Sequence, residues 1–127
     1  MTRFLVATSS VHVTAAAADY LQGRIDPDTD DVIVLAVREP DAPDRDAGDA
    51  ANVARSRLAA AMPTTETRAG DSTGEILSAV DEHDPDELIV GAHRGTAGAG
   101  PGPGSTAREL IERLDRPVVV VPVPRLE

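Results

Sequence analysis

The residues best suited to chemistry lie between Gly91 and Pro122, in the segment GAHRGTAGAGPGPGSTARELIERLDRPVVVVP. A glycine-rich stretch without acids follows the apolar run Leu88-Ile89-Val90, and it ends at Gly104-Ser105-Thr106, where a helix is predicted to begin. A glycine loop between a strand and a helix start exposes unpaired backbone N–H groups, which bind phosphate. The segment therefore predicts an anion-binding loop.

Several common motifs for catalysis and cofactor binding are absent from the sequence. Because the chain has no Lys, it cannot contain a P-loop, and its glycine spacing matches neither a dinucleotide fingerprint nor a nucleophile elbow. His12, His83 and His93 share no helical face, so we expect no preformed histidine metal site. No pair of carboxylates stands out from the acidic clusters either, so the residues favour binding over catalysis.

The charge of the chain is strongly negative and unusual in its make-up. The formal net charge is −10, and all 12 basic residues are Arg. Such a surface repels nucleic acid and anionic membranes, so neither is an expected partner. The many acids are explained either by simple solubility or by a high-salt, halophilic cytoplasm. The use of Arg without Lys is also explained by genomic base composition.

The acids are unevenly distributed along the chain. Residues 1–18 and 91–108 contain none, although the chain holds 22, and the second segment carries His93 and Arg94. This distribution favours an anionic ligand. The alternative is that strands and alanine-rich helices lack acids anyway, as residues 50–65 also do.

Length and composition indicate one cytoplasmic domain over residues 1–127. A chain of 127 residues can bury a sizeable core, and the absence of Cys suits a reducing compartment. The apolar runs are too short to span a membrane, and the N-terminus does not resemble a signal peptide.

Short apolar runs alternate with stretches of helical periodicity. Strands are expected at 4–7, 32–37, 64–68, 86–90 and 117–122, helices at 13–21, 50–61, 72–84 and 105–114, and an exposed loop at 39–49. A capping box, Ser72 to Glu75, is expected to start the third helix. This alternation predicts an α/β fold with a five-stranded parallel sheet, order 3-2-1-4-5, and helices on both faces. The ligand crevice would then lie between the first and fourth strands, walled by the run from Ala7 to Ser10 and by Gly91 onward.

The spacing of the glycines, together with the flanking runs, resembles the universal stress protein family over nearly the whole chain. Gly91 and Gly104-Ser105 match the separations of the family signature, which is a glycine, two residues, a glycine, nine residues and Gly-Ser or Gly-Thr. The runs at 86–90 and 116–121 and the pair Gly70-Asp71 resemble family strands and a helix start. The resemblance implies a Rossmann-like fold of the adenine nucleotide alpha hydrolase type.

The chain departs from the family at several positions. Arg94 stands where the second signature glycine is expected, and its side chain would either block phosphate or contact it. The nucleotide-binding branch has an Asp after the first strand that helps to hold adenosine, and the matching residue here is Ser9. Val37 matches the adenine-contacting position, although a valine there is also expected of plain core.

The resemblance therefore implies two alternative functions. In the first, the protein binds ATP, with Mg²⁺, or a related adenine nucleotide. The predicted ligand-binding residues are Ala7, Thr8, Ser9, Val37, Gly91, His93, Arg94, Gly104, Ser105 and Thr106. In the second, the site is degenerate and the protein is a dimeric stress-response module without nucleotide. At most slow ATP hydrolysis is expected, because no base or metal carboxylate is evident near the loop.

The valine run near the C-terminus predicts self-association. Val118, Val119, Val120 and Val121 would form an edge strand, and family members commonly dimerise through this strand. We therefore expect a homodimer by antiparallel edge pairing. Pro117 and Pro122 would limit the ladder or, in the alternative, protect the edge from association.

Overall fold

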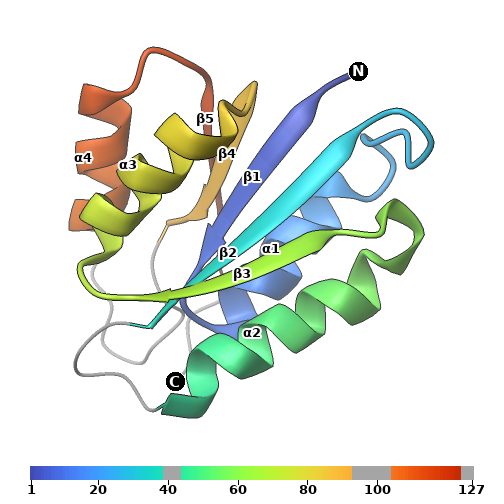
Figure 1. The fold of residues 1–127 in the computed structure, drawn as a ribbon, viewed down its shortest axis with the longest axis horizontal. Coiled ribbons are helices and arrows are strands. Elements are labelled where there is room, and N and C mark those ends of the chain that lie inside the picture. The colour runs from blue at the N-terminus through green and yellow to red at the C-terminus, as the bar shows by residue number, and fades with distance from the viewer. Residues whose placement is uncertain (39–43, 93–103, 124–127) are drawn as a thin grey trace.

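The apolar runs form the strands of one parallel sheet, and the amphipathic stretches cover it on both faces (Figure 1). The computed structural model describes residues 1–38, 44–92 and 104–123. Its elements are β1 (Arg3–Thr8), α1 (Val11–Leu21), β2 (Asp31–Arg38), α2 (Asp44–Arg57), the 3-10 helix η1 (Ala59–Ala61), β3 (Thr64–Ala69), α3 (Ser72–His83), β4 (Glu87–Gly91), α4 (Ser105–Arg113) and β5 (Val118–Val121). The strand order is β3-β2-β1-β4-β5, which confirms the predicted fold class. Within the described residues, no helix is long and apolar enough to cross a membrane.

The central strands are apolar on both sides because helices bury both faces of the sheet. Leu5 and Leu35 face α3 and α4 and pack with Ile76 and Leu110. Their sequence neighbours point the opposite way, where Val34 and other side chains pack against α1 and α2. The core is therefore two layers, one on each side of the sheet.

Helix α2 begins earlier than predicted. The expected loop at 39–49 is wrong from Asp44 onward, where the helix starts. Ala47, Ala50 and Ala54 lie on its buried face with exposed fractions of 2%, 0% and 0%. Asp46, near the start of the helix, suits the positive end of the helix dipole. The sequence did not predict this turn for two reasons. Its residues are rich in Asp and Gly, which favour loops, and its buried face consists of small alanines rather than large apolar side chains.

Helix α3 also begins differently from the predicted capping box. The N-cap is Asp71, whose carboxylate accepts a hydrogen bond from the Gly74 N–H at 2.9 Å, so Ser72 is the first helical residue. Gly70 has φ of +140°, a backbone conformation that other residues rarely adopt. The Gly70-Asp71 pair therefore makes the turn from β3 into α3.

The two edge strands differ in character. The edge strand β3 has the sequence TTETRA, which is polar and carries two charges. The other edge strand, β5, consists of four valines, of which Val118, Val119 and Val120 are half-buried. The sheet therefore has one charged edge and one apolar edge.

Candidate functional site

The sheet reverses its strand order between β1 and β4, and this is where the sequence predicts a crevice. From β1 the chain continues to β2 and β3 on one side, whereas β4 leads to β5 on the other. Ala7 pairs with Val90, so Thr8 and Gly91 follow at the same edge of the sheet. Ligands of open α/β sheets bind at such a point, beyond the carboxyl ends of the strands.

A network of hydroxyl groups fixes the turn between β1 and α1. The Thr8 hydroxyl donates to the Ser10 carbonyl at 2.8 Å and lies 3.3 Å from the Ser10 N–H. Thr14, which is buried in α1, donates to the Thr8 hydroxyl at 3.0 Å. Ser10 caps α1 by accepting from the Val13 N–H at 3.3 Å. Because the turn already uses the Thr8 hydroxyl, Thr8 offers a ligand mainly its backbone.

Thr14 is a residue that sequence reasoning missed. It stands four residues after Ser10 at the start of an alanine run, and its hydroxyl lies 3.1 Å from the Ser10 carbonyl oxygen. A buried threonine in an otherwise apolar helix face is the signal that points to such a role, because a buried hydroxyl needs a partner.

The start of α4 is held directly against the end of β4. The Ala92 N–H donates to the Val121 carbonyl at 2.9 Å, and the Gly104 N–H donates to the Ala92 carbonyl at 2.7 Å. The two ends of the signature segment, Gly91 and Gly104, are therefore brought together. This contact places the first turn of α4 at the carboxyl edge of the sheet, at the end of β4.

The first turn of α4 carries no side-chain cap. Its N-cap is Gly104, and within the described residues no side chain bonds to the helix start, whereas Ser10 and Asp71 cap α1 and α3. The N–H groups at a helix start have no partner within the helix, and the helix dipole adds positive potential there. Such a turn suits an anion.

The fold itself does not require glycine at position 104. Its φ of −70° and ψ of 173° are open to any residue. An added Cβ would stand 3.6 Å from the Ala92 carbonyl oxygen, which is an ordinary contact. What the glycine provides is an uncovered helix start.

The predicted site residues fall into three groups. Ala7, Thr8 and Val37 are buried, and Val37 packs in the same core cluster as Ala7. Those at least partly accessible to a ligand are Ser9, Gly91, Gly104, Ser105 and Thr106. His93 and Arg94 lie outside the described residues. The structure thus brings Ala7, Thr8 and Gly91 together by strand pairing, and Gly104 by its bond to Ala92.

Two acids that precede the signature in sequence have structural roles elsewhere in the fold. The Asp86 carboxylate accepts from the Arg3 N–H at 2.8 Å, which places it at the opposite, amino edge of the sheet. The Asp71 carboxylate caps α3. The segments that wall the crevice, within 1–18 and 91–108, contain no acid. Within the described residues, the start of α4 with its N–H groups is therefore the feature that would balance the negative charge of a phosphate.

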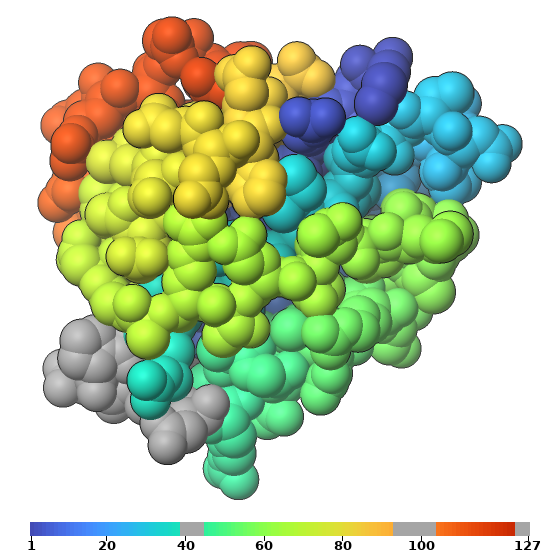
Figure 2. Space-filling model, in the orientation of Figure 1, coloured from blue at the N-terminus to red at the C-terminus, as the bar shows by residue number. Residues whose placement is uncertain are grey.

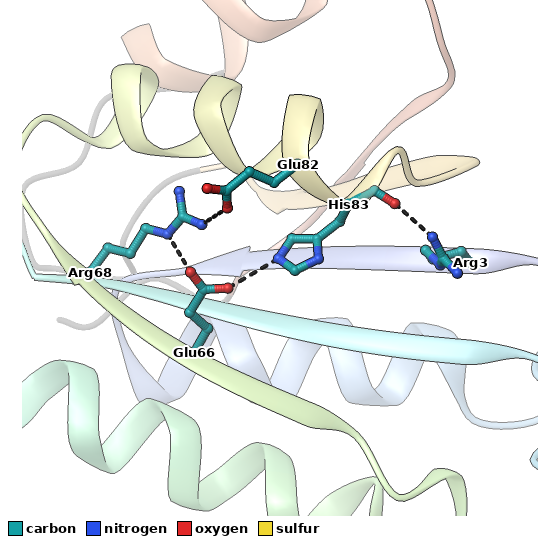
Figure 3. Close-up of polar contacts among 5 residues, drawn as sticks. All are labelled: Arg3, Glu66, Arg68, Glu82 and His83. Atoms are coloured by element: carbon teal, nitrogen blue, oxygen red, sulfur yellow. Dashed lines mark hydrogen bonds and ion pairs between the residues drawn. The ribbon is translucent and has the colours of Figure 1, made fainter.

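A second polar cluster joins β3 to the end of α3 (Figure 3). Glu66 accepts from Arg68 at 2.5 Å and lies 3.0 Å from His83 Nε2. Arg68 also bonds to Glu82, and Arg3 donates to the His83 carbonyl at 2.8 Å. Partial burial raises the pKa of Glu66, but the hydrogen bonds with Arg68 and His83 outweigh it and hold that pKa below its ordinary value. Sequence reasoning missed this cluster because its members come from a strand and a helix end.

Comparison with known structures supports the fold. The chain is similar to the hypothetical protein MJ0577, with a TM-score of 0.78 and 17% identity over 98% of each chain. It is also similar to the universal stress protein UspA from Lactobacillus plantarum (TM-score 0.73, 22% identity, 94% of this chain and 97% of that one). A third similar structure is the universal stress protein from Archaeoglobus fulgidus in complex with dAMP (TM-score 0.62, 18% identity, 95% and 98%).

A comparison with family models identifies the family to which the chain belongs. A comparison with curated proteins gives no match. The model of the universal stress protein family, in contrast, matches residues 1–122, which include β1, the signature glycines and β5. With the strand order and the paired ends of the signature in place, the chain belongs to the universal stress protein family.

Proposed function

We propose that this protein is a cytoplasmic regulatory module of the stress response that binds an adenine nucleotide in the crevice between β1 and β4. The observation that carries the proposal is the uncapped first turn of α4, held at the end of β4 by the bond between Gly104 and Ala92. Universal stress proteins of this fold occur in complexes with cAMP, with dAMP and, in Arabidopsis thaliana, with AMP. The absence of Cys fits a reducing compartment.

The ligand would lie across the crevice with its phosphate at α4. The N–H groups of Ser105 and Thr106 and the Ser105 hydroxyl would receive the phosphate oxygens. The Ser9 segment would line the nucleoside end, and Val37, whose side chain is buried, would offer its backbone there. Since the crevice walls contain no acid, Mg²⁺ would enter only with the phosphates of ATP. For the same reason we expect at most slow hydrolysis.

The direct test is to look for nucleotide in the purified protein. After denaturation, the supernatant is assayed for released adenine nucleotide, and the refolded protein is titrated with ATP, AMP and cAMP, with and without Mg²⁺. We expect released nucleotide or saturable binding below millimolar concentration. If neither is seen, the alternative holds: a homodimeric interaction protein with a degenerate site, as Ser9 in place of the family's Asp suggests.

A substitution at the helix start separates binding from folding. Gly104→Asp adds a good N-cap at a position with room for a Cβ, so the free energy of unfolding should change by only about a few tenths of a kcal/mol. The same carboxylate occupies the phosphate position. Two like charges about 4 Å apart repel by roughly 1–4 kcal/mol, so the Kd for ATP should rise about tenfold or more.

The matched control for Gly104→Asp is Ala59→Asp, which adds the same charge at an exposed position of η1, just before β3 begins. We expect this variant to bind ATP as the wild type does. Equal affinity of Gly104→Asp and Ala59→Asp would place the phosphate elsewhere.

We also propose that the protein forms a homodimer through β5. An exposed strand edge pairs readily unless charges or prolines protect it. The edge strand β3 carries Glu66 and Arg68, whereas β5 presents Val118 to Val121 without a charge. The apolar edge is therefore the one suited to a second copy of the chain.

A further inference from the structure

The last turn of α3 brings metal-ligand side chains together over β3 (Figure 3). Glu66 projects from the strand, and Glu82 and His83 end the helix. One ligand atom from each of the three lies within 4.8 Å of the other two. Ligand atoms about 2.0–2.2 Å from a zinc ion stand roughly 3–3.6 Å apart, so small side-chain movements would close the site.

We propose that Glu66, Glu82 and His83 form a binding site for a divalent transition metal ion, with Zn²⁺ as the reference ion. One imidazole and two carboxylates are a ligand set that such ions accept, with positions left open for water. His83 Nε2 and Glu66 Oε2 already stand 3.0 Å apart, with a proton between them. The metal ion would replace that proton.

Arg68 holds the two carboxylates in place without occupying all of their oxygens. Its Nε bonds to Glu66 Oε1 and its Nη2 to Glu82 Oε2. The bond to Oε1 leaves Glu66 Oε2 facing His83. In Figure 3 the second oxygen of Glu82 points away from His83, so the Glu82 carboxylate would have to rotate or exchange its bond with Arg68 to bind the ion. Outer groups of this kind orient the ligands of a metal site. Two carboxylates and one guanidinium also leave a negative charge on the cluster, which favours a cation.

Two of the three proposed ligands, Glu82 and His83, line a groove that is open to solvent. The groove has a volume of about 350 Å³, and its lining includes Arg3, Asp31, Met62, Glu82 and His83. On the face shown in Figure 2, atoms of β2 are visible between those of α3 and those of β3. A metal ion would therefore have an entry path, and its open positions would face the groove.

The site is separate from the nucleotide crevice. Helix α3 starts at the carboxyl edge of the sheet, after β3, and ends near the amino edge, where the Asp86 N–H donates to the Arg3 carbonyl at 2.8 Å. A metal ion bound here would fasten the end of α3 to the edge strand β3. It would stabilise the fold independently of nucleotide.

The test is titration of the full chain, freed of metal with EDTA, with ZnCl2 by calorimetry and with CoCl2 by visible absorption. We expect one equivalent of Zn²⁺, a cobalt spectrum with imidazole and carboxylate ligands, and a higher melting temperature with Zn²⁺. His83→Gln and Glu82→Gln should each weaken Zn²⁺ binding by about 10–100-fold or more. Because Glu82 is an exposed side chain, Glu82→Gln tests the site even if His83→Gln folds poorly.

The matched control is His12→Gln, which removes an exposed histidine of α1. It should bind Zn²⁺ as the wild type does. Absence of stoichiometric Zn²⁺ binding would overturn the proposal, and so would binding that survives both His83→Gln and Glu82→Gln.

Discussion

Two residues at opposite ends of the proposed nucleotide site would govern what it binds. Gly104 leaves the first turn of α4 uncovered, although its backbone angles and surroundings would accept a side chain. Ser9 follows β1, where the nucleotide-binding branch that the chain resembles has an Asp. The phosphate end is therefore suited to an anion, while the nucleoside end lacks one ionic acceptor.

Restoring that acceptor should strengthen binding of the nucleoside. Ser9→Asp places a carboxylate where it can accept from ribose hydroxyls, and hydrogen bonds to charged groups contribute about 1.5–3 kcal/mol. We expect the affinity for adenosine, which has no phosphate, to rise about tenfold or more in calorimetry. Ser9→Ala serves as the control and should bind adenosine no more tightly than the wild type does. An Asp variant that binds adenosine no better than the Ala variant would contradict the placement of the nucleoside.

At the scale of elements, the turn from β1 into α1 depends on a buried hydroxyl. Thr14→Val keeps the shape of the side chain but removes the donor to Thr8 and the Ser10 carbonyl. Loss of a buried hydrogen bond costs about 1–3 kcal/mol of unfolding free energy, which urea denaturation measures. Thr67→Val, on the exposed edge of β3, should change it by less than about 0.5 kcal/mol. Equal effects of the two substitutions would exclude a structural role for the network.

The stabilisation that Glu66 contributes by joining β3 to α3 should depend on pH. Hydrogen bonds with Arg68 and His83 hold the folded-state pKa of Glu66 below its ordinary value of 4.5, against the effect of partial burial. A lowered folded-state pKa stabilises the fold above the unfolded-state pKa, and this stabilisation is lost as pH falls through the folded-state value. The difference in unfolding free energy between wild type and Glu66→Gln should be full above pH 4.5 and shrink below it.

Urea denaturation of both proteins from neutral to acidic pH measures that difference. Comparing the two proteins at each pH cancels the contribution of the other acids. A difference that stays constant or grows in acid would contradict the assignment of the ionised form to Glu66.

How far the sequence predicts the elements depends on which interactions define them. Strands such as β2 are continuous apolar runs, and the expected order of the sheet is confirmed. The sequence did not predict the first turn of α2, because the residues that pack there are alanines. It gave the wrong N-cap for α3, because Asp71 and Ser72 are both suitable N-cap residues. The Glu66 and His83 contact joins residues 17 apart in a strand and a helix, so no local spacing reveals it.

For the whole molecule, net charge and strand edges act in opposite directions on association. Each chain carries −10, so two copies repel each other at low ionic strength. Salt at about 1 M shortens the screening length to about 3 Å and removes most of this repulsion. The apolar edge at β5 would then pair with its copy, so we expect association to strengthen as salt is raised.

The hydrogen-bond register of β5 allows a direct test of that pairing. The Leu88 N–H donates to the Pro117 carbonyl and the Ala92 N–H to the Val121 carbonyl, so alternate residues face β4. The N–H of Val120 then faces outward. Val120→Pro removes it and keeps the β4 ladder, because proline is tolerated on an edge strand. Val120→Ala makes a similar loss of apolar packing but retains the N–H.

In sedimentation at molar KCl, we expect the wild type and Val120→Ala to be dimers and Val120→Pro to be a monomer with the same circular dichroism spectrum. If the proline variant associates as strongly as the alanine variant, the interface does not use this edge. A monomeric wild type at every salt concentration would mean that the prolines that flank β5 protect the edge instead. Of the two, Pro122 is the one whose nitrogen faces outward, where it cannot donate to a partner strand.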